Sequence, residues 1–211
     1  SCVKNGKAAA QLNNSLRNPW FRTTMPEIYF EECSMTLLKT LRLILSPCAP
    51  VARVNFIQLE LDPEVMRFLN NGAVDHDRID STTAPFLMPR GTEPNVWTAR
   101  RNADDEFVGW FCLLPKGRAL AEIGYRLRRE AWGQGLATEG ALALIGWGFE
   151  VAGYDKIVAN TMAVNQGSRR VMEKIGMKHT RTDFLDFPDP IPGTEHGEGT
   201  HELSCSEWAN N

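Results

Sequence analysis

The chain has 211 residues, of which 43% are hydrophobic and 23% charged, and its formal net charge is -3. This length supports one domain with a substantial core of its own, rather than two domains. The slight negative charge argues against nucleic-acid binding through bulk positive charge, and no apolar run reaches the length of a membrane span. We therefore expect neither a nucleic-acid nor a membrane partner.

Residues 1–35 differ from the rest of the chain, because they show no sustained hydrophobic period. We interpret them as an N-terminal extension, and residues 36–211 as the folded domain. The first residues lack the basic-then-apolar pattern of a signal peptide, which favours a cytoplasmic protein. Five cysteines are scattered without a Cys-x-x-Cys pair. Reduced thiols fit this spacing better than a disulfide framework or a zinc site, so we expect no metal.

The first half of the domain predicts three strands and one helix. The strands are expected at residues 41–46, 96–101 and 107–114, and the helix at 62–70. Asp62 suits the N-cap of that helix and Pro63 its first position. The turn "NADDE" joins the second and third strands as a hairpin. Residues 71–95 are polar and contain prolines, which indicates a loop.

The second half alternates strands with helices. Strands are expected at 121–127, 156–162 and 201–208, and helices from about Gly135 to Ala152 and between Asn165 and Gly176. Asn165 suits the N-cap of the second helix, and Gly176 its C-terminal stop. A loop rich in proline and glycine covers 188–199. Strands first and strand–helix alternation later predict a mixed α/β (α+β) sheet.

The junction "WGQGLA" (132–137) places two glycines where a strand becomes a helix. Unpaired N–H groups at a helix N-terminus suit an anion. The phosphate loop of NTPases needs a lysine and a hydroxyl where this chain has Ala141 and Leu142, and the dinucleotide motif needs a glycine where it has Thr138. Both templates therefore fail. A tight turn that only permits close helix packing is the plain alternative.

A third template fits and comes from a known family. The stretch "GYRLRREAWGQGLATEG" resembles the "GY-x-L…WG-x-G-[YL]-ATEA" signature of GNAT acetyltransferases of the ribosomal-protein (RimJ/RimL-type) branch, and departs from it at Gly140. The second signature appears as "NQGSRRVMEKIGM" (165–177), and the family start as "TLRLILSP" (40–47). The resemblance covers about residues 36–208. It implies the GNAT fold: a mixed, mostly antiparallel sheet flanked by helices, in which the fourth and fifth strands (121–127 and 156–162) splay apart.

The resemblance also implies a co-substrate, acetyl-CoA. Its pyrophosphate would bind the glycine turn, and its pantetheine arm would bind between the splayed strands and be held by Asn165, whose alternative role is helix capping. Backbone groups of residues 125–127 would polarise the thioester carbonyl. The residues expected to bind acetyl-CoA are Tyr125, Arg126, Leu127, Trp132, Gly133, Gln134, Gly135, Leu136, Ala137, Thr138, Asn165, Ser168 and Arg170. Neighbouring basic residues suit the 3′-phosphate end as a group, although each alone fits a solvated surface.

Two residues are expected to be catalytic. Ser168 stands where this branch often has a serine near the CoA sulfur, so it is the candidate proton donor to the thiolate; the alternative is a serine with no chemical role. The superfamily often has a tyrosine for this role, where this chain has Met172. Glu122 is the candidate base, and its alternative is a solvated edge charge. His196 and His201 remain outside the main hypothesis, and water is enough as base for an α-amine.

These residues predict an acetyl-CoA-dependent N-acetyltransferase. The acetyl group would pass to a primary amine, either a protein N-terminus or a small-molecule amine, by direct attack in a ternary complex. The acceptor walls, expected at 66–95 and 184–200, have an acidic tendency that hints at a cationic amine. A non-catalytic acyl-CoA-binding module is the alternative. We expect a monomer or a homodimer.

Overall fold

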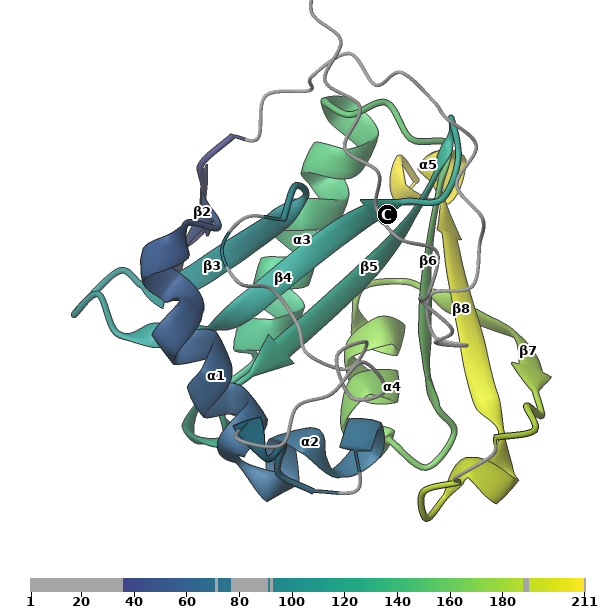
Figure 1. The fold of residues 1–211 in the computed structure, drawn as a ribbon. Coiled ribbons are helices and arrows are strands. Elements are labelled where there is room, and N and C mark those ends of the chain that lie inside the picture. Colours follow the sequence, from purple (N-terminus) through teal and green to yellow (C-terminus); the bar gives the residue numbers. More distant parts are fainter. Residues whose placement is uncertain (1–35, 71, 77–90, 92, 188–189, 211) are drawn as a thin grey trace, which may run out of the picture.

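The computed structural model describes residues 36–70, 72–76, 91, 93–187 and 190–210, which form one mixed sheet flanked by helices (Figure 1). The strands are β1 (Leu38–Lys39), β2 (Leu43–Pro47), β3 (Val96–Arg101), β4 (Phe107–Pro115), β5 (Leu120–Leu127), β6 (Lys156–Met162), β7 (Lys178–Asp183) and β8 (Glu198–Ser204). Their order in the sheet is β1-β2-β3-β4-β5-β6-β8-β7. Every neighbouring pair is antiparallel except β5 and β6. This confirms the fold class expected from the sequence.

Helices cover both faces of the sheet. They are α1 (Arg53–Leu61), α2 (Pro63–Asn70), α3 (Leu136–Glu150), α4 (Gln166–Lys174) and the single turn α5 (Cys205–Trp208). Helices α1 and α2 lie over one face of β3–β5, and α3 and α4 lie on the other face (Figure 1). Within the described residues, no helix is long and apolar enough to cross a membrane.

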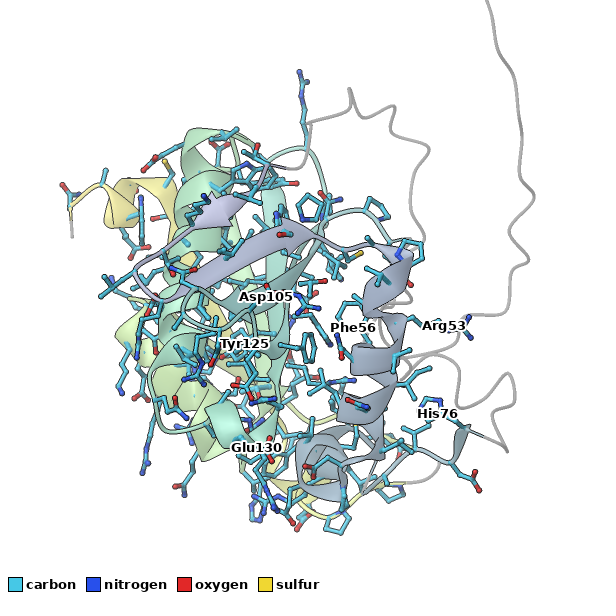
Figure 2. All side chains as sticks on the ribbon, turned by 90° about the vertical axis from the view of Figure 1, so that its left-hand side faces the viewer. Arg53, Phe56, His76, Asp105, Tyr125 and Glu130 are labelled. Carbon is cyan, nitrogen blue, oxygen red and sulfur yellow. The ribbon has the colours of Figure 1, made fainter. Side chains whose placement is uncertain are left out.

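Each face has its own hydrophobic core. The larger core packs α3 against the sheet, with Trp97 and Trp147 in edge-to-face contact at 5.0 Å between ring centroids. The smaller core lies under α1, where Phe56 points toward the sheet while Arg53 points away from it (Figure 2). Burial of apolar side chains, aliphatic and aromatic, on both faces holds the helices against the sheet.

Most predicted elements are confirmed. The strands expected at 96–101 and 156–162 match β3 and β6, and Asp62 caps α2 by accepting the N–H of Glu64 at 2.9 Å. The N-terminal extension 1–35 and most of the predicted loop 71–95 lie outside the described residues. The departure from the family signature at Gly140 has a physical reason, since a methyl group there would come within 2.3 Å of the Phe111 ring.

Several elements differ from the sequence predictions, including β1, a two-residue strand that was not predicted. Helix α1 was not predicted because its N-cap, Ala52, offers no side-chain cap. Strand β7 was not predicted because it is an edge strand of polar residues, without alternation of apolar side chains. The strand expected at 201–208 is wrong in its second half: β8 spans 198–204, and Ser204 and Glu207 then form a capping box that starts α5.

Candidate active site

The sheet splits between β5 and β6. Their parallel pairing is confined to Leu120–Lys156, Ala121–Ile157 and Glu122–Val158. Beyond Glu122 the two strands diverge, and the last five residues of β5 pair only with β4 (Figure 1). These are the strands expected as fourth and fifth; here they are β5 and β6 because the two-residue β1 precedes them. The edge of β5 that faces the split offers backbone N–H and C=O groups to an extended ligand.

The glycine turn leads from the split into α3. Gly133 and Gly135 both adopt left-handed backbone angles, with φ of 72° and 77°. Gly135 is the N-cap of α3 and supplies no side-chain cap, so the first-turn N–H groups have no such partner. Trp132 fixes the turn by donating its indole N–H to the carbonyl of Leu127 at 2.9 Å. This arrangement fits a phosphate, because a left-handed glycine lets an anion approach the helix N-terminus.

An ion pair of Arg42, in the turn between β1 and β2, holds the glycine turn from outside. Arg42 donates from Nε to Glu139 at 2.6 Å and from Nη1 to the carbonyl of Gln134 at 2.8 Å. Thr40 and the backbone N–H of Arg42 also donate to Glu139, at 2.6 and 2.7 Å. Burial alone would raise the pKa of Glu139, but these hydrogen bonds and the charge of Arg42 lower it. Glu139 therefore stays ionised and ties the first turn of α3 to the turn between β1 and β2.

A pair of hydroxyls lies behind the split, between β5 and α4. The oxygens of Tyr125 and Ser168 are 3.0 Å apart, and the Tyr125 hydroxyl also lies 3.2 Å from the carbonyl of Ser168. Asn165 caps α4 by accepting the N–H of Ser168 at 3.2 Å. Burial raises the pKa of Tyr125 to about 12, against a smaller lowering effect of Ser168. The sequence suggested only a backbone role for Tyr125, but its side chain contacts Ser168. The chain thus has a tyrosine hydroxyl near Ser168 even though Met172 occupies the position where the family often has its tyrosine.

The other residues expected to bind acetyl-CoA divide by location. Gln134 is exposed in the turn, Thr138 and Ala137 are partly exposed in the first turn of α3, and Leu136 and Leu127 are buried in the larger core. The side chain of Arg126 lies on the opposite face, near Glu60 and over Trp110. From that position only the backbone of Arg126, and not its side chain, can contact a ligand in the split. Arg170 is exposed on α4.

The α1/α2 face of the split carries carboxylates. Glu122 lies on β5 at the last β5–β6 pair, and its two oxygens accept from Lys116 at 2.7 Å and Asn160 at 3.2 Å. Asn160 in turn accepts from Thr200 on β8 at 2.9 Å. Since alternate residues of a strand share a face, Glu198 lies on this same face as Thr200. Tyr125 lies on the opposite face, three residues after Glu122.

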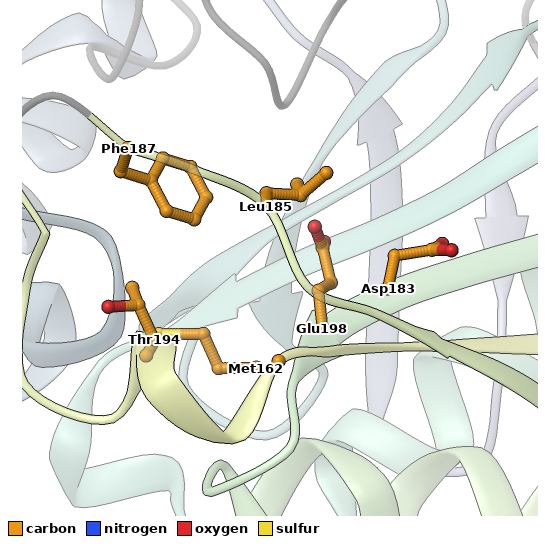
Figure 3. A pocket seen from close by; sticks show the side chains of 7 residues that line it. Met162, Asp183, Leu185, Phe187, Thr194 and Glu198 are labelled. Atoms are coloured by element: carbon orange, nitrogen blue, oxygen red, sulfur yellow. The ribbon is translucent and has the colours of Figure 1, made fainter.

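Glu198 was missed because the sequence placed it in a loop. It begins β8 and pairs with Met162 of β6 and Asp183 of β7. Its side chain lies in a small recess together with Leu185 and Phe187 (Figure 3). Burial, and then the charges of Glu122 and Asp183, raise the pKa of Glu198 to about 7. Isolated between two glycines, this residue has no motif by which a sequence could reveal it.

The two histidines left outside the main hypothesis lie away from this recess. His201 is buried among the residues of β8 and contacts the ring of His179. Burial lowers the pKa of His201, and the neighbouring His179 lowers it further. His196 is exposed beside Glu195. Neither lines the recess that holds Glu198.

Comparisons with known proteins agree with this geometry. A family model described as "Acetyltransferase (GNAT) domain" matches residues 42–178. The chain is 33% identical over 181 residues to the FsC-acetyl coenzyme A-N(2)-transacetylase of Aspergillus fumigatus, covering 81% of this chain and 77% of that protein.

Solved structures share the fold at low identity. A GNAT acetyltransferase from Bacillus anthracis superposes with a TM-score of 0.65 at 22% identity, over 81% of this chain and 99% of that one. The spermidine N-acetyltransferase from Vibrio cholerae, solved with CoA and spermine, superposes with a TM-score of 0.64 at 14% identity, over 80% of this chain and 98% of that one.

Proposed function

The chain belongs to the GNAT acetyltransferase family, which uses acetyl-CoA, and from this premise we propose that it moves the acetyl group to the nitrogen of a primary amine. The transfer takes place by direct attack of the amine on the thioester in a ternary complex. The split between β5 and β6 carries this proposal, because it opens the sheet between a helix N-terminus suited to phosphate and a face lined by carboxylates.

On the donor side, acetyl-CoA supplies the thioester, and the chain supplies its anchors. The turn of residues 132–138 receives the pyrophosphate, and the free edge of β5 at Tyr125–Leu127 pairs with the pantetheine arm. Asn165, Ser168 and the exposed Arg170 complete the proposed binding set. Ser168 is the proposed proton donor to the sulfur, and its contact with Tyr125 supports that role, since a hydrogen-bonded hydroxyl is oriented for proton transfer.

On the acceptor side, Glu122 is a carboxylate on β5, one of the two strands that form the split. It lies at the point where the β5–β6 pairing ends, and we assign it to the positioning of the amine. Its contact with Asn160 joins it to β6 and β8 through Thr200. Its charge therefore faces an amine that enters from the α1/α2 side.

The acceptor is proposed to be a cationic amine. Glu122, Asp183 and Glu198 line the same face, and negative charge there attracts an ammonium group. The printed name of the Aspergillus relative specifies a nitrogen, N(2), and a neighbour with the same fold was solved with spermine. The sequence signatures favour the RimJ/RimL-type branch, whose acceptors would be protein N-termini. A small amine and a peptide N-terminus therefore both belong in the test.

Two measurements test the proposal. Acetyl-CoA should raise the melting temperature, because a ligand that binds only the folded state stabilises it, whereas ATP and NAD should do much less. Release of free CoA should then result from addition of L-lysine, spermidine or a peptide with a free serine N-terminus. Stabilisation by NAD alone would contradict the CoA site. Stabilisation by acetyl-CoA without release of CoA to any amine would favour a non-catalytic acyl-CoA-binding module, which no observation on the described residues supports.

A further inference from the structure

We propose that Glu198 is the general base that removes a proton from the acceptor amine. This role rests on the proposed acetyl transfer and assigns a further catalytic residue to it. The evidence is the position of Glu198 relative to the split, the absence of a partner for its carboxylate among the described residues, and the surroundings that hold it.

The position follows from strand register. Glu198 pairs with Met162, the last residue of β6, in the stretch of β6 that β5 has left. One strand therefore separates Glu198 from the open edge of β5. Its side chain lies on the α1/α2 face, while the Tyr125–Ser168 pair lies on the α4 face. An amine that enters from the α1/α2 face would therefore lie on the same side of the thioester as Glu198. The hydroxyls of Tyr125 and Ser168, on the opposite face, would lie on the side of the sulfur.

The carboxylate of Glu198 differs from that of Glu122 in what it contacts. Glu122 already accepts from Lys116 and Asn160, so the transfer of a proton to it would disturb an ion pair. Glu198 forms no salt bridge or side-chain hydrogen bond within the described part of the chain, and it lies beside Met162, Leu185 and Phe187. Figure 3 shows its carboxylate within this recess, between Leu185 and Asp183.

These surroundings suit a base that works near neutral pH. Burial, and then the charges of Glu122 from β5 and Asp183 from β7, raise the pKa of Glu198 to about 7. Two cations also lie nearby: Lys116 pairs with Glu122, and Arg181 pairs with Asp183 at 2.7 Å. A base is most effective when its pKa lies near the operating pH. Since Glu198 must be deprotonated to act, activity should rise as pH increases through about 7.

Protons balance over the reaction. The acceptor arrives as an ammonium ion and gives one proton to the Glu198 carboxylate. The freed lone pair attacks the thioester carbonyl, a C–N bond forms, and the C–S bond breaks as the carbonyl re-forms. The sulfur takes a proton from the hydroxyl side, and the nitrogen loses its second proton, which replaces the one donated to sulfur. Glu198 then returns its proton to water, so each turnover releases an amide, free CoA and one proton.

The test compares Glu198→Gln with Glu202→Gln, a matched control on the same strand and face that pairs with Lys156 at 2.6 Å. The acceptor is whichever of L-lysine, spermidine and the serine peptide gives the fastest CoA release with the unmodified protein. Glu198→Gln should lower kcat/KM at pH 7 by about 10²-fold, a usual size for the loss of a general base, while acetyl-CoA affinity is unchanged. Glu202→Gln should keep normal kinetics.

The pH profile separates a base from a structural residue. In the unmodified protein kcat/KM should rise to a bend near pH 7, whereas in Glu198→Gln it should rise without that bend until the amine itself is deprotonated. Asp183→Asn removes a negative charge beside Glu198, so the pKa of Glu198 falls and the bend should move to lower pH.

Three outcomes would overturn the inference. Normal kinetics and an unchanged profile in Glu198→Gln would exclude Glu198 as the base. If Glu198→Gln does not fold, the test uses the pH profile of kcat/KM for Asp183→Asn. A bend that stays at the same pH as in the unmodified protein would contradict the assignment. If the unmodified protein releases no CoA with any amine, acetyl transfer itself fails, and the base falls with it. This last case is distinguishable because the unmodified protein, and not only the variant, is inactive.

Discussion

The two sides of the split differ in how the chain builds them. On the donor side, the glycine turn and the start of α4 are short continuous segments shaped by local features, such as the left-handed glycines and the cap from Asn165 to Ser168. On the acceptor side, Glu122, Asn160, Asp183 and Glu198 come from four strands that meet only through sheet pairing. A ligand held by backbone geometry thus leaves a sequence motif, whereas a wall assembled from distant side chains leaves none.

The largest effect on acetyl-CoA binding is expected from a substitution that changes the backbone of the donor side. Gly135→Val should raise the acetyl-CoA dissociation constant at least about a hundredfold, because the new side chain fills the space over the helix N-terminus where a phosphate would bind. A left-handed angle at a non-glycine residue also costs about 1–2 kcal/mol. The nearest described atom is Arg42 Nη2 at 3.5 Å, so the fold itself has room for the substitution. Calorimetric titration with acetyl-CoA measures the effect.

Gly153→Val is the matched control for strain. Gly153 comes after the same helix, has φ of 72° and has no atom within 4 Å of an added Cβ. It should lose similar stability and keep its affinity for acetyl-CoA. Equal loss of affinity in both variants would attribute the effect to general destabilisation, and unchanged affinity in folded Gly135→Val would remove the turn from the site.

The next effect, no larger than that of Gly135→Val, is expected at the hydroxyl pair of Tyr125 and Ser168, which acts in the chemistry rather than in binding. Ser168→Ala should lower kcat by about 10²-fold with little change in acetyl-CoA affinity, as for the loss of a general acid. Steady-state and burst kinetics with a responsive amine measure it. Tyr125→Phe removes the partner of Ser168 at 3.0 Å and should lower kcat less, because the serine remains.

The pair also has an outcome that would exclude this role. The α4 N-terminus lies next to Ser168 and can itself stabilise a thiolate. If Ser168→Ala keeps the normal rate while chemistry limits turnover, the serine serves only as a helix residue. If Tyr125→Phe proves slower than Ser168→Ala, the tyrosine, which the sequence suggested for its backbone alone, is the better donor.

The contrast between the two sides also explains what the sequence could predict. The mixed sheet and the capped starts of α2 and α4 follow from local patterns: Asp62 and Asn165 accept the N–H groups that their positions require. The boundary near residue 36 and the roles of the site residues stay predictions. The split between the fourth and fifth strands came from the family resemblance, since no local pattern encodes it.

What could not be predicted depends on pairing. β7 is an edge strand whose polar side chains give no alternating signal, so Asp183 had no assigned place beside Glu198. Glu198 was assigned to a loop, and its surroundings exist only once β6, β7 and β8 align. The end of β8 was predictable in principle, because "SCSE" has the spacing of a capping box at Ser204 and Glu207.

The smallest effect on acetyl-CoA binding is expected from the loss of a side chain that supports the turn. It tests whether the donor side depends on side chains as well as on backbone geometry. Arg42 holds the turn through Glu139 and the carbonyl of Gln134, but its side chain is 44% exposed. Exposed ion pairs contribute about 0.2–1 kcal/mol, so Arg42→Ala should weaken acetyl-CoA binding only about two- to fivefold. Arg100→Ala, which removes an exposed pair with Asp105 in the β3–β4 hairpin, is the control and should leave binding unchanged.

The size of the Arg42 effect decides between two views of the turn. If backbone angles alone shape the turn, the loss should stay within this range and diminish in high salt, which screens exposed charges. A loss of about a hundredfold, equal to that of Gly135→Val, would mean that the ion pair with Glu139 creates the phosphate site rather than supporting it. In that case the donor side, like the acceptor side, would depend on contacts between residues far apart in the sequence, because Arg42 and Glu139 are 97 positions apart.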